Sequence, residues 1–176
     1  MYFKGAVLFS LLASSFALPT TGDRKVKRDH LQVQDYSEFQ VSSGVAGNAL
    51  AEVNAKFPID ASDFANVAAE DIAILKAARE TAEAAETDAG GFNDAIEAAG
   101  GKNTAAGKAL QNGKIKNKVL KLQLQVLVAQ IEAAQGKDTA AKLAAESKKL
   151  TNNINLDKAA AGQKSTAVDF QGTSQP

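Results

Sequence analysis

The stretch of sequence that decides the fold is Lys114-Ile115-Lys116-Asn117-Lys118-Val119-Leu120-Lys121-Leu122-Gln123-Leu124-Gln125-Val126-Leu127-Val128-Ala129-Gln130-Ile131-Glu132. On a helical wheel of about 100° per residue, one face carries Ile115, Val119, Leu122, Val126 and Ala129. The nearly opposite face carries Leu120, Leu124, Leu127, Val128 and Ile131. A helix that is apolar on two opposite faces packs against neighbours on both sides. The stretch therefore predicts the central helix of a bundle.

Apolar residues at helical spacing predict further helices on both sides of this one. The expected helices cover residues 45–57, 69–88, 92–99, 104–135 and 138–162, and residues 35–41 are expected to be a short extended segment. Ser43 and Thr104 are suited to cap the helices that follow them, and Pro58 and the pair Gly90-Gly91 are suited to end those before them. Alanine, with 35 of 176 residues, also favours helix. We predict an all-α fold, an antiparallel bundle of about four to six helices with a two-faced central helix.

Two glycines and a polar tail leave details of this bundle open. Gly107 and Gly113 each cost a helix about 1 kcal/mol relative to alanine. They mark either a kink or close crossing in one long helix, or a separate helix over residues 105–111 followed by a turn at residues 112–113.

Residues 163–176 are expected to form a mobile tail, within which residues 167–170 could dock on, or pair with, residues 38–41.

The amino terminus has the pattern of a targeting segment. Lys4 precedes an apolar run over residues 5–13, and small residues follow up to Ala17. This pattern predicts a secretory signal peptide over residues 1–17 with cleavage after Ala17. The apolar run of about nine residues is too short for a bilayer, which needs roughly 20.

A short basic segment separates the signal peptide from the predicted bundle. Residues 18–28 are polar, rich in turn formers, and end in the dibasic pair Lys27 and Arg28, which a processing protease of the secretory pathway can recognise. We predict a pro-segment over residues 18–28 and a bundle domain over residues 29–162. The alternative is a solvated run of charge that is not cleaved.

Processing would change the charge of the protein. The full chain has a formal net charge of zero, whereas residues 29–176 carry 15 basic and 19 acidic residues, a net −4. Residues 29–97 carry three basic and 14 acidic residues, and residues 98–176 carry 12 and five. We interpret this asymmetry as oppositely charged helices packed antiparallel in one domain. Aromatic residues do not interleave with the lysines, so we expect no nucleic-acid partner.

The composition excludes many kinds of catalytic and metal site. The chain has no cysteine and one histidine, which excludes a disulfide scaffold, a zinc ribbon, a thiol nucleophile and a site with two imidazoles. Glu80, Glu83 and Glu86 repeat at three-residue spacing, but carboxylates need further ligands or a cleft to act on a cation or a proton. We interpret them as a solvated acidic face. We expect no enzymatic activity, no catalytic residues, no metal and no cofactor.

One cluster of residues remains as a candidate binding site. Lys114, Lys116, Lys118 and Lys121 lie close together in the central stretch, and a lysine near an anionic surface contributes about 1 kcal/mol to binding. On the wheel the four side chains point in different directions, and the acidic first half of the chain competes for them. We keep them as a candidate site for an anion or a partner.

Three segments of the chain resemble a group of secreted proteins. Residues 39–53, residues 77–83 and above all residues 109–122, which contain Asn112-Gly113-Lys114-Ile115-Lys116-Asn117-Lys118, resemble cysteine-free, alanine-rich small secreted proteins of filamentous ascomycete fungi. The resemblance implies export to the apoplast or cell wall, and a candidate effector role in fungi that colonise hosts. It carries over no catalytic residue.

These observations favour a secreted, monomeric, non-enzymatic protein that interacts with a host or cell-wall component through its helical surface. One alternative is an extracellular carrier, with a fatty acid or another apolar ligand held between alanine-lined helices. The other is a structural cell-wall protein. A filled bundle interior would favour the interaction protein over the carrier, and a hollow interior would favour the carrier.

Overall fold

The computed structural model describes residues 30–176. The predicted signal peptide and pro-segment, with Ala17, Lys27 and Arg28, lie outside the described residues. The described elements are α1 (Tyr36–Phe39), β1 (Gly44–Val45), α2 (Ala49–Lys56), the 3₁₀ helix η1 (Ala61–Asn66), α3 (Ala69–Thr87), α4 (Phe92–Ala98), α5 (Ala105–Ala134), α6 (Ala140–Ala159) and β2 (Lys164–Ser165). The all-α bundle is confirmed, and the one small sheet pairs β1 with β2.

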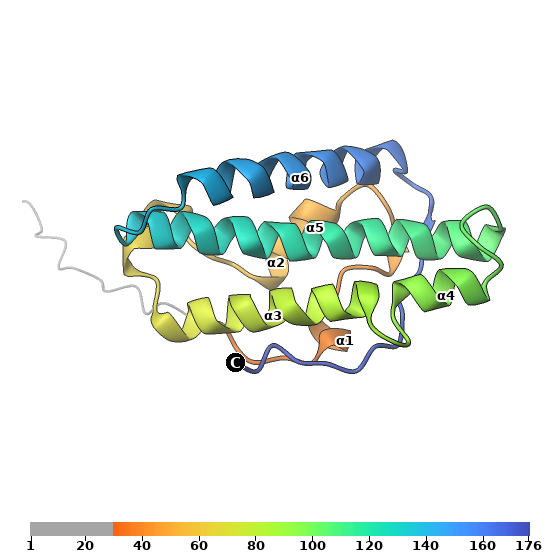
Figure 1. Ribbon diagram of the computed structural model, residues 1–176, viewed down its shortest axis with the longest axis horizontal. Coiled ribbons are helices and arrows are strands. Elements are labelled where there is room, and N and C mark those ends of the chain that lie inside the picture. Colours follow the sequence, from red (N-terminus) through yellow and green to blue (C-terminus); the bar gives the residue numbers. More distant parts are fainter. Residues whose placement is uncertain (1–29) are drawn as a thin grey trace, which may run out of the picture.

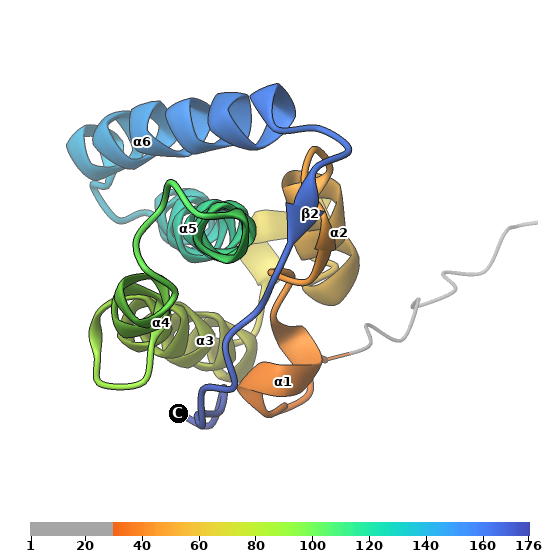
Figure 2. The same ribbon diagram turned by 90° about the vertical axis from the view of Figure 1, so that its right-hand side faces the viewer.

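Helix α5 is the axis of the bundle. Its 30 residues span about 45 Å, and α3, α5 and α6 alternate in direction, so that they pack antiparallel (Figure 1). Seen end on, α6 crosses one side of α5, α3 and α4 lie on the opposite side, and α2 lies on a third (Figure 2). The fourth side of α5, between α3 and α6, is left without a covering helix (Figure 2).

The two apolar faces predicted for the central helix pack into two separate cores. Leu120, Leu124, Leu127, Val128 and Ile131 belong to the larger core, which includes Tyr36, Phe39, Leu75 and Ala78. Val119, Leu122 and Val126 belong to the smaller core, with Ala49 of α2 and Leu150 of α6. The prediction of a two-faced central helix is confirmed.

The glycines of α5 mark close approaches within one continuous helix. The side chain of Thr104 caps this helix by accepting from Gly107 N at 2.9 Å. A Cβ at Gly107 would lie 2.0 Å from the carbonyl oxygen of Gly101, and a Cβ at Gly113 would lie 2.0 Å from that of Thr166. The alternative of a separate short helix and a turn is excluded, because residues 105–134 are helical throughout.

Two predictions for residues 35–57 were wrong. Residues 36–39 form one helical turn instead of an extended segment, because Glu38 accepts from the backbone N–H of Asp35 and completes a capping box. Helix α2 begins at Ala49, not near Val45, because Gly47 adopts a φ of 118° that does not continue a helix.

The predicted mobile tail lies against the bundle. Ser165 pairs with Gly44 in the small sheet, and Thr173 forms a bridge with Asp35. Phe170 packs edge-on against Tyr36, with ring centroids 5.9 Å apart, and Ser174 is 1% exposed. We call residues 163–176 the C-terminal strap, because they connect the end of α6 to the amino-terminal segment. The expected pairing of residues 167–170 with residues 38–41 is not formed; residues 172–174 instead bond to residues 34–36.

Candidate functional site

Lys116 is a structural residue, in contrast to its predicted role in an anion site. Its Nζ donates to the carbonyl oxygens of Ser43 and Val45 at 3.0 Å each and lies 2.9 Å from Oε2 of Glu52. The side chain is 1% exposed. No donor of Lys116 is therefore directed to solvent, and we remove it from the candidate set.

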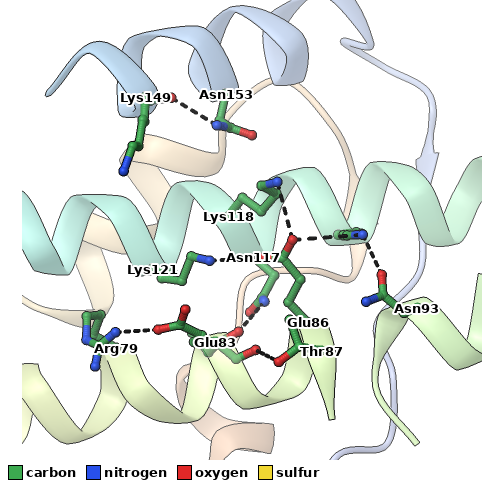
Figure 3. A network of polar contacts seen from close by, with 12 residues as sticks. Arg79, Glu83, Glu86, Thr87, Asn93, Asn117, Lys118, Lys121, Lys149 and Asn153 are labelled. Carbon is green, nitrogen blue, oxygen red and sulfur yellow. Dashed lines mark hydrogen bonds and ion pairs between the residues drawn. The ribbon is translucent and has the colours of Figure 1, made fainter. Parts of the chain in front are cut away.

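The other three predicted lysines converge on one carboxylate (Figure 3). The Nζ atoms of Lys121, Lys118 and Lys114 lie 2.9, 3.3 and 3.8 Å from the carboxylate oxygens of Glu86 on α3. The wheel analysis separated these side chains, but spacings of four and three residues keep them on one side of α5, and lysine is long enough to reach a common partner. Glu86 is 7% exposed, so the interpretation of residues 80, 83 and 86 as one solvated acidic face was wrong at residue 86.

Three neighbouring ammonium groups hold Glu86 in its charged form. Burial raises the pKa of Glu86, but the hydrogen bonds and positive charges of Lys121 and Lys118 outweigh burial, so the pKa lies below its ordinary value. Three cations around one carboxylate leave an excess of positive charge at this point of the α3–α5 interface. Ion pairs thus join α3 of the acidic half of the chain to the antiparallel α5 of the basic half, as predicted from the charge asymmetry.

This arrangement predicts a pH-dependent effect of Glu86→Gln. Since the folded pKa lies below the ordinary value of about 4.3, the unfolded chain binds more protons as pH falls, and the stabilisation by Glu86 is lost on acidification. We expect Glu86→Gln to lower the free energy of unfolding at pH 7 and to have a smaller effect at pH 3.5. Urea unfolding at both pH values measures this difference. The control is Glu80→Gln, whose side chain is 70% exposed; an equal loss from Glu86→Gln at both pH values would contradict the assignment.

Beside these lysines, a cleft of about 380 Å³ opens between three helices. Its lining residues are Arg79 and Glu83 of α3, Lys118, Lys121, Leu122 and Gln125 of α5, and Glu146, Lys149 and Asn153 of α6. Side chains from all three helices surround this space (Figure 3). The cleft lies on the side of α5 that no helix covers.

A second cleft of about 290 Å³ adjoins the first and shares Arg79 and Gln125 with it. Its other lining residues are Lys76, Glu80, Val128 and Lys142. We call the two clefts together the α3–α6 groove. The groove is lined by six basic side chains and three acidic ones. The carboxylates of Glu86 and Glu132 lie beside Lys118, Lys121 and Lys76, so the positive charge that faces solvent is carried mainly by the exposed Lys142 and Lys149.

Weak ion pairs hold two cations of the groove, Arg79 and Lys149, whereas Lys118 and Lys121 pair with Glu86, and Lys76 pairs with Glu132. Arg79 contacts Glu83 and lies 2.9 Å from Glu80, and Lys149 lies 2.9 Å from Glu146. Each pair has at least one side chain that is half exposed or more. Exposed pairs contribute about 0–1 kcal/mol, so an incoming anion can take the place of the internal carboxylate. The groove is therefore suited to bind a ligand that carries negative charge.

Sequence reasoning found two residues of the groove, Lys118 and Lys121, and missed the rest. Arg79, Lys142 and Lys149 come from other helices, and only the folded arrangement brings them together. A local signal was present, because Lys142 and Lys149 are seven residues apart and therefore share one face of α6. Combining that face with the central lysines needs the position of α6 on α5, which a single sequence does not supply.

Other kinds of site receive no support from residues 30–176. In this part of the chain no group of three or more histidine, cysteine, aspartate or glutamate side chains is arranged to hold a metal ion. None of its helices combines the length and apolar character needed to span a membrane. His30 lies at the start of the described chain, where its Nδ1 is 3.3 Å from Oδ2 of Asp71, and it lines neither cleft.

The segments that carry the resemblance to fungal secreted proteins meet inside the bundle. Asn117 donates to the carbonyl oxygen of Ala82 at 2.7 Å and accepts from the hydroxyl of Tyr36 at 2.8 Å. Burial raises the pKa of Tyr36 to about 12. Together with the contacts of Lys116, these bonds join residues 109–122 to the other two segments. Residues 39–53, 77–83 and 109–122 therefore meet at one packing centre.

A family model described as a domain of unknown function, DUF8454, matches residues 31–169. The chain belongs to the DUF8454 family. The matched range includes every helix from α1 to α6, and so both walls and the floor of the groove. Comparison of the chain with curated proteins gave no match, and neither did comparison with solved structures.

Proposed function

We propose that this protein is a secreted, non-enzymatic interaction protein that acts at the fungal surface or the host interface, in the apoplast or cell wall. It binds a host or cell-wall component through the α3–α6 groove. The observation that carries this proposal is the groove itself, in which basic side chains of three helices line one open surface. A structural cell-wall protein would not need such a concentration of charge in a hollow.

The packing of the bundle supports an interaction protein over a carrier of an apolar ligand. Both apolar faces of α5 are buried against neighbouring helices in the two cores. The two clefts of the groove open to solvent and are lined largely by charged and amide side chains. A fatty acid is instead held best in an apolar pocket with few polar groups.

Two features support export. The amino terminus has the sequence pattern of a signal peptide followed by a dibasic pair. The family match begins at Leu31, two residues after the mature terminus expected at Asp29. The leader therefore precedes the part of the chain that the family shares.

Affinity capture tests the proposed function. The protein is immobilised and exposed to host extracellular fluid and to isolated wall material, and saturable binding is measured. We expect a partner that the wild type retains and that the double variant Lys142→Glu/Lys149→Glu loses, because both residues are exposed and line the groove.

The control is Lys102→Glu/Lys148→Glu, which makes the same change in charge at exposed residues outside the groove. Equal retention by all three proteins would show that the groove is not the contact surface. Native mass spectrometry of the secreted protein tests the carrier alternative, since a co-purifying lipid would overturn the proposal.

A further inference from the structure

The groove has basic walls, and the two apolar side chains of its lining, Leu122 and Val128, are only 4% and 3% exposed. Leu122 and Val128 of α5 lie on its floor, and Gln125 lies between them in sequence. The long side chains of Arg79 and Lys149 reach in from α3 and α6 (Figure 3). A ligand that fits this groove needs negative charges for its walls and hydrogen-bonding groups for its amide side chains.

The length of the groove corresponds to a short extended chain. Its floor runs along α5 from Lys118 to Val128, which is about 15 Å at 1.5 Å per residue. An extended peptide advances about 3.3 Å per residue, so about five residues span this distance. Successive side chains of an extended peptide point to opposite sides, which allows one side to be apolar and the other acidic.

We propose that the α3–α6 groove binds an extended acidic segment of a partner protein, about five residues long. The carboxylates of the segment are bound by Arg79, Lys142 and Lys149, and its backbone amides lie against Gln125 and Asn153. The proposal rests on the proposed function, in which the groove is the contact surface, and it adds the chemistry of the partner.

The lining residues favour a peptide over an acidic sugar or a nucleic acid. Among the described residues that line the groove there is no aromatic ring on which a sugar ring or a base could stack. Amide groups are present instead, at Gln125 and Asn153. The Nδ2 of Asn153 donates to the carbonyl oxygen of Lys149 at 2.9 Å, which leaves its Oδ1 to accept from a peptide N–H.

The charge balance also fits a segment with a few carboxylates. Three of the six lining cations, Lys118, Lys121 and Lys76, are already paired with Glu86 and Glu132. A five-residue segment of alternating glutamate and leucine carries three carboxylates, one for each of the remaining cations Arg79, Lys142 and Lys149. Because the cations are partly exposed, salt screens them. We therefore expect binding to weaken at least tenfold between about 0.05 M and 1 M salt.

Fluorescence anisotropy with the full chain tests this inference. The probe is a labelled pentapeptide of alternating glutamate and leucine, with glutamine–leucine and lysine–leucine pentapeptides as controls. We expect saturable binding of the acidic probe only, weakened at least tenfold by Lys142→Glu/Lys149→Glu. The variant Lys102→Glu/Lys148→Glu, which has the same net charge, should bind within twofold of the wild type, and the melting temperature of each variant confirms folding.

Several results would overturn the inference. The first is that the glutamine–leucine peptide binds as tightly as the glutamate–leucine peptide. The second is that both double variants lose the same affinity for the acidic peptide. The third is that an oligomer of uronic acids binds while the acidic peptide does not. If affinity capture recovers a groove-dependent partner while the acidic peptide does not bind, the inference fails and the proposed function stands. If capture recovers nothing and the peptide does not bind, both fail.

Discussion

Replacing Gly113 with alanine is expected to lower the free energy of unfolding by about 3 kcal/mol, although the same substitution stabilises an ordinary helix by about 1 kcal/mol. The added Cβ would lie 2.0 Å from the carbonyl oxygen of Thr166 and 3.1 Å from Cε1 of Phe92. The nearer atom belongs to the backbone of the C-terminal strap, and overpacking of this kind costs about 1–3 kcal/mol or more. We expect the strap to move away from α5 and to lose the hydrogen bond from Thr166 N to the carbonyl oxygen of Ala109, 2.9 Å long.

Urea unfolding followed by circular dichroism measures the loss of stability, and hydrogen exchange at the amide of Thr166 reports detachment of the strap. The control is Ala106→Gly, an exposed position of the same helix, which should show only the propensity cost of about 1 kcal/mol. A chain ending at Gln163 completes a double-mutant cycle, because Gly113→Ala should not destabilise a protein without the strap. A Gly113→Ala protein as stable as the wild type would disprove the close contact.

The regular part of the fold was predictable because each long helix carries its own local signal. The two apolar faces of residues 115–131 indicated a helix between two cores, and Thr104 indicated where that helix begins. These signals depend on neighbours a few residues away in sequence. They therefore survive in the folded chain regardless of how the other helices pack.

The irregular part was not predictable, because contacts between distant residues determine it. Gly47 and Ala49 at the start of α2 both donate to the carboxylate of Asp157, at 2.9 Å each, and Asp157 lies at the end of α6. The strap shows the same dependence, since Gln34 donates to the hydroxyl of Ser174 at 2.8 Å. No periodicity links these positions, so the sequence analysis assigned the wrong start to α2 and a mobile tail to residues that pack.

The sequence predicted the part of the candidate site that lies on α5, but not the parts that α3 and α6 contribute. The lysine-rich stretch of α5 was visible in the sequence, but its four side chains have different surroundings. Lys116 is enclosed by a loop and α2, whereas Lys118 and Lys121 lie between Glu86 and the groove. A wheel shows the direction of a side chain and not which helix lies there, so the roles of these lysines depend on the placement of α2, α3 and α6.

Lys116→Met is the second substitution with a large expected effect, a loss of about 3–4 kcal/mol in the free energy of unfolding. Methionine fills a similar volume but cannot donate, so the carbonyl oxygens of Ser43 and Val45 lose the partner that each has at 3.0 Å. A hydrogen bond from a charged donor contributes about 1.5–3 kcal/mol, and two such bonds are lost. Glu52, whose side chain is 38% exposed, can regain hydration, so its contribution to the loss is smaller.

A matched control separates this effect from the general loss of a lysine. Lys118→Met removes the same charge from the same helix at a side chain that is 35% exposed, and it should cost less than about 1 kcal/mol. Combining Lys116→Met with Glu52→Gln should cost little more than Lys116→Met alone, because both changes remove the same ion pair. If the two lysine variants unfold at the same urea concentration, the ammonium of Lys116 does not hold residues 43–45 on α5. If Lys116→Met is much less stable, the buried lysine is part of the packing centre that joins residues 39–53 to residues 109–122.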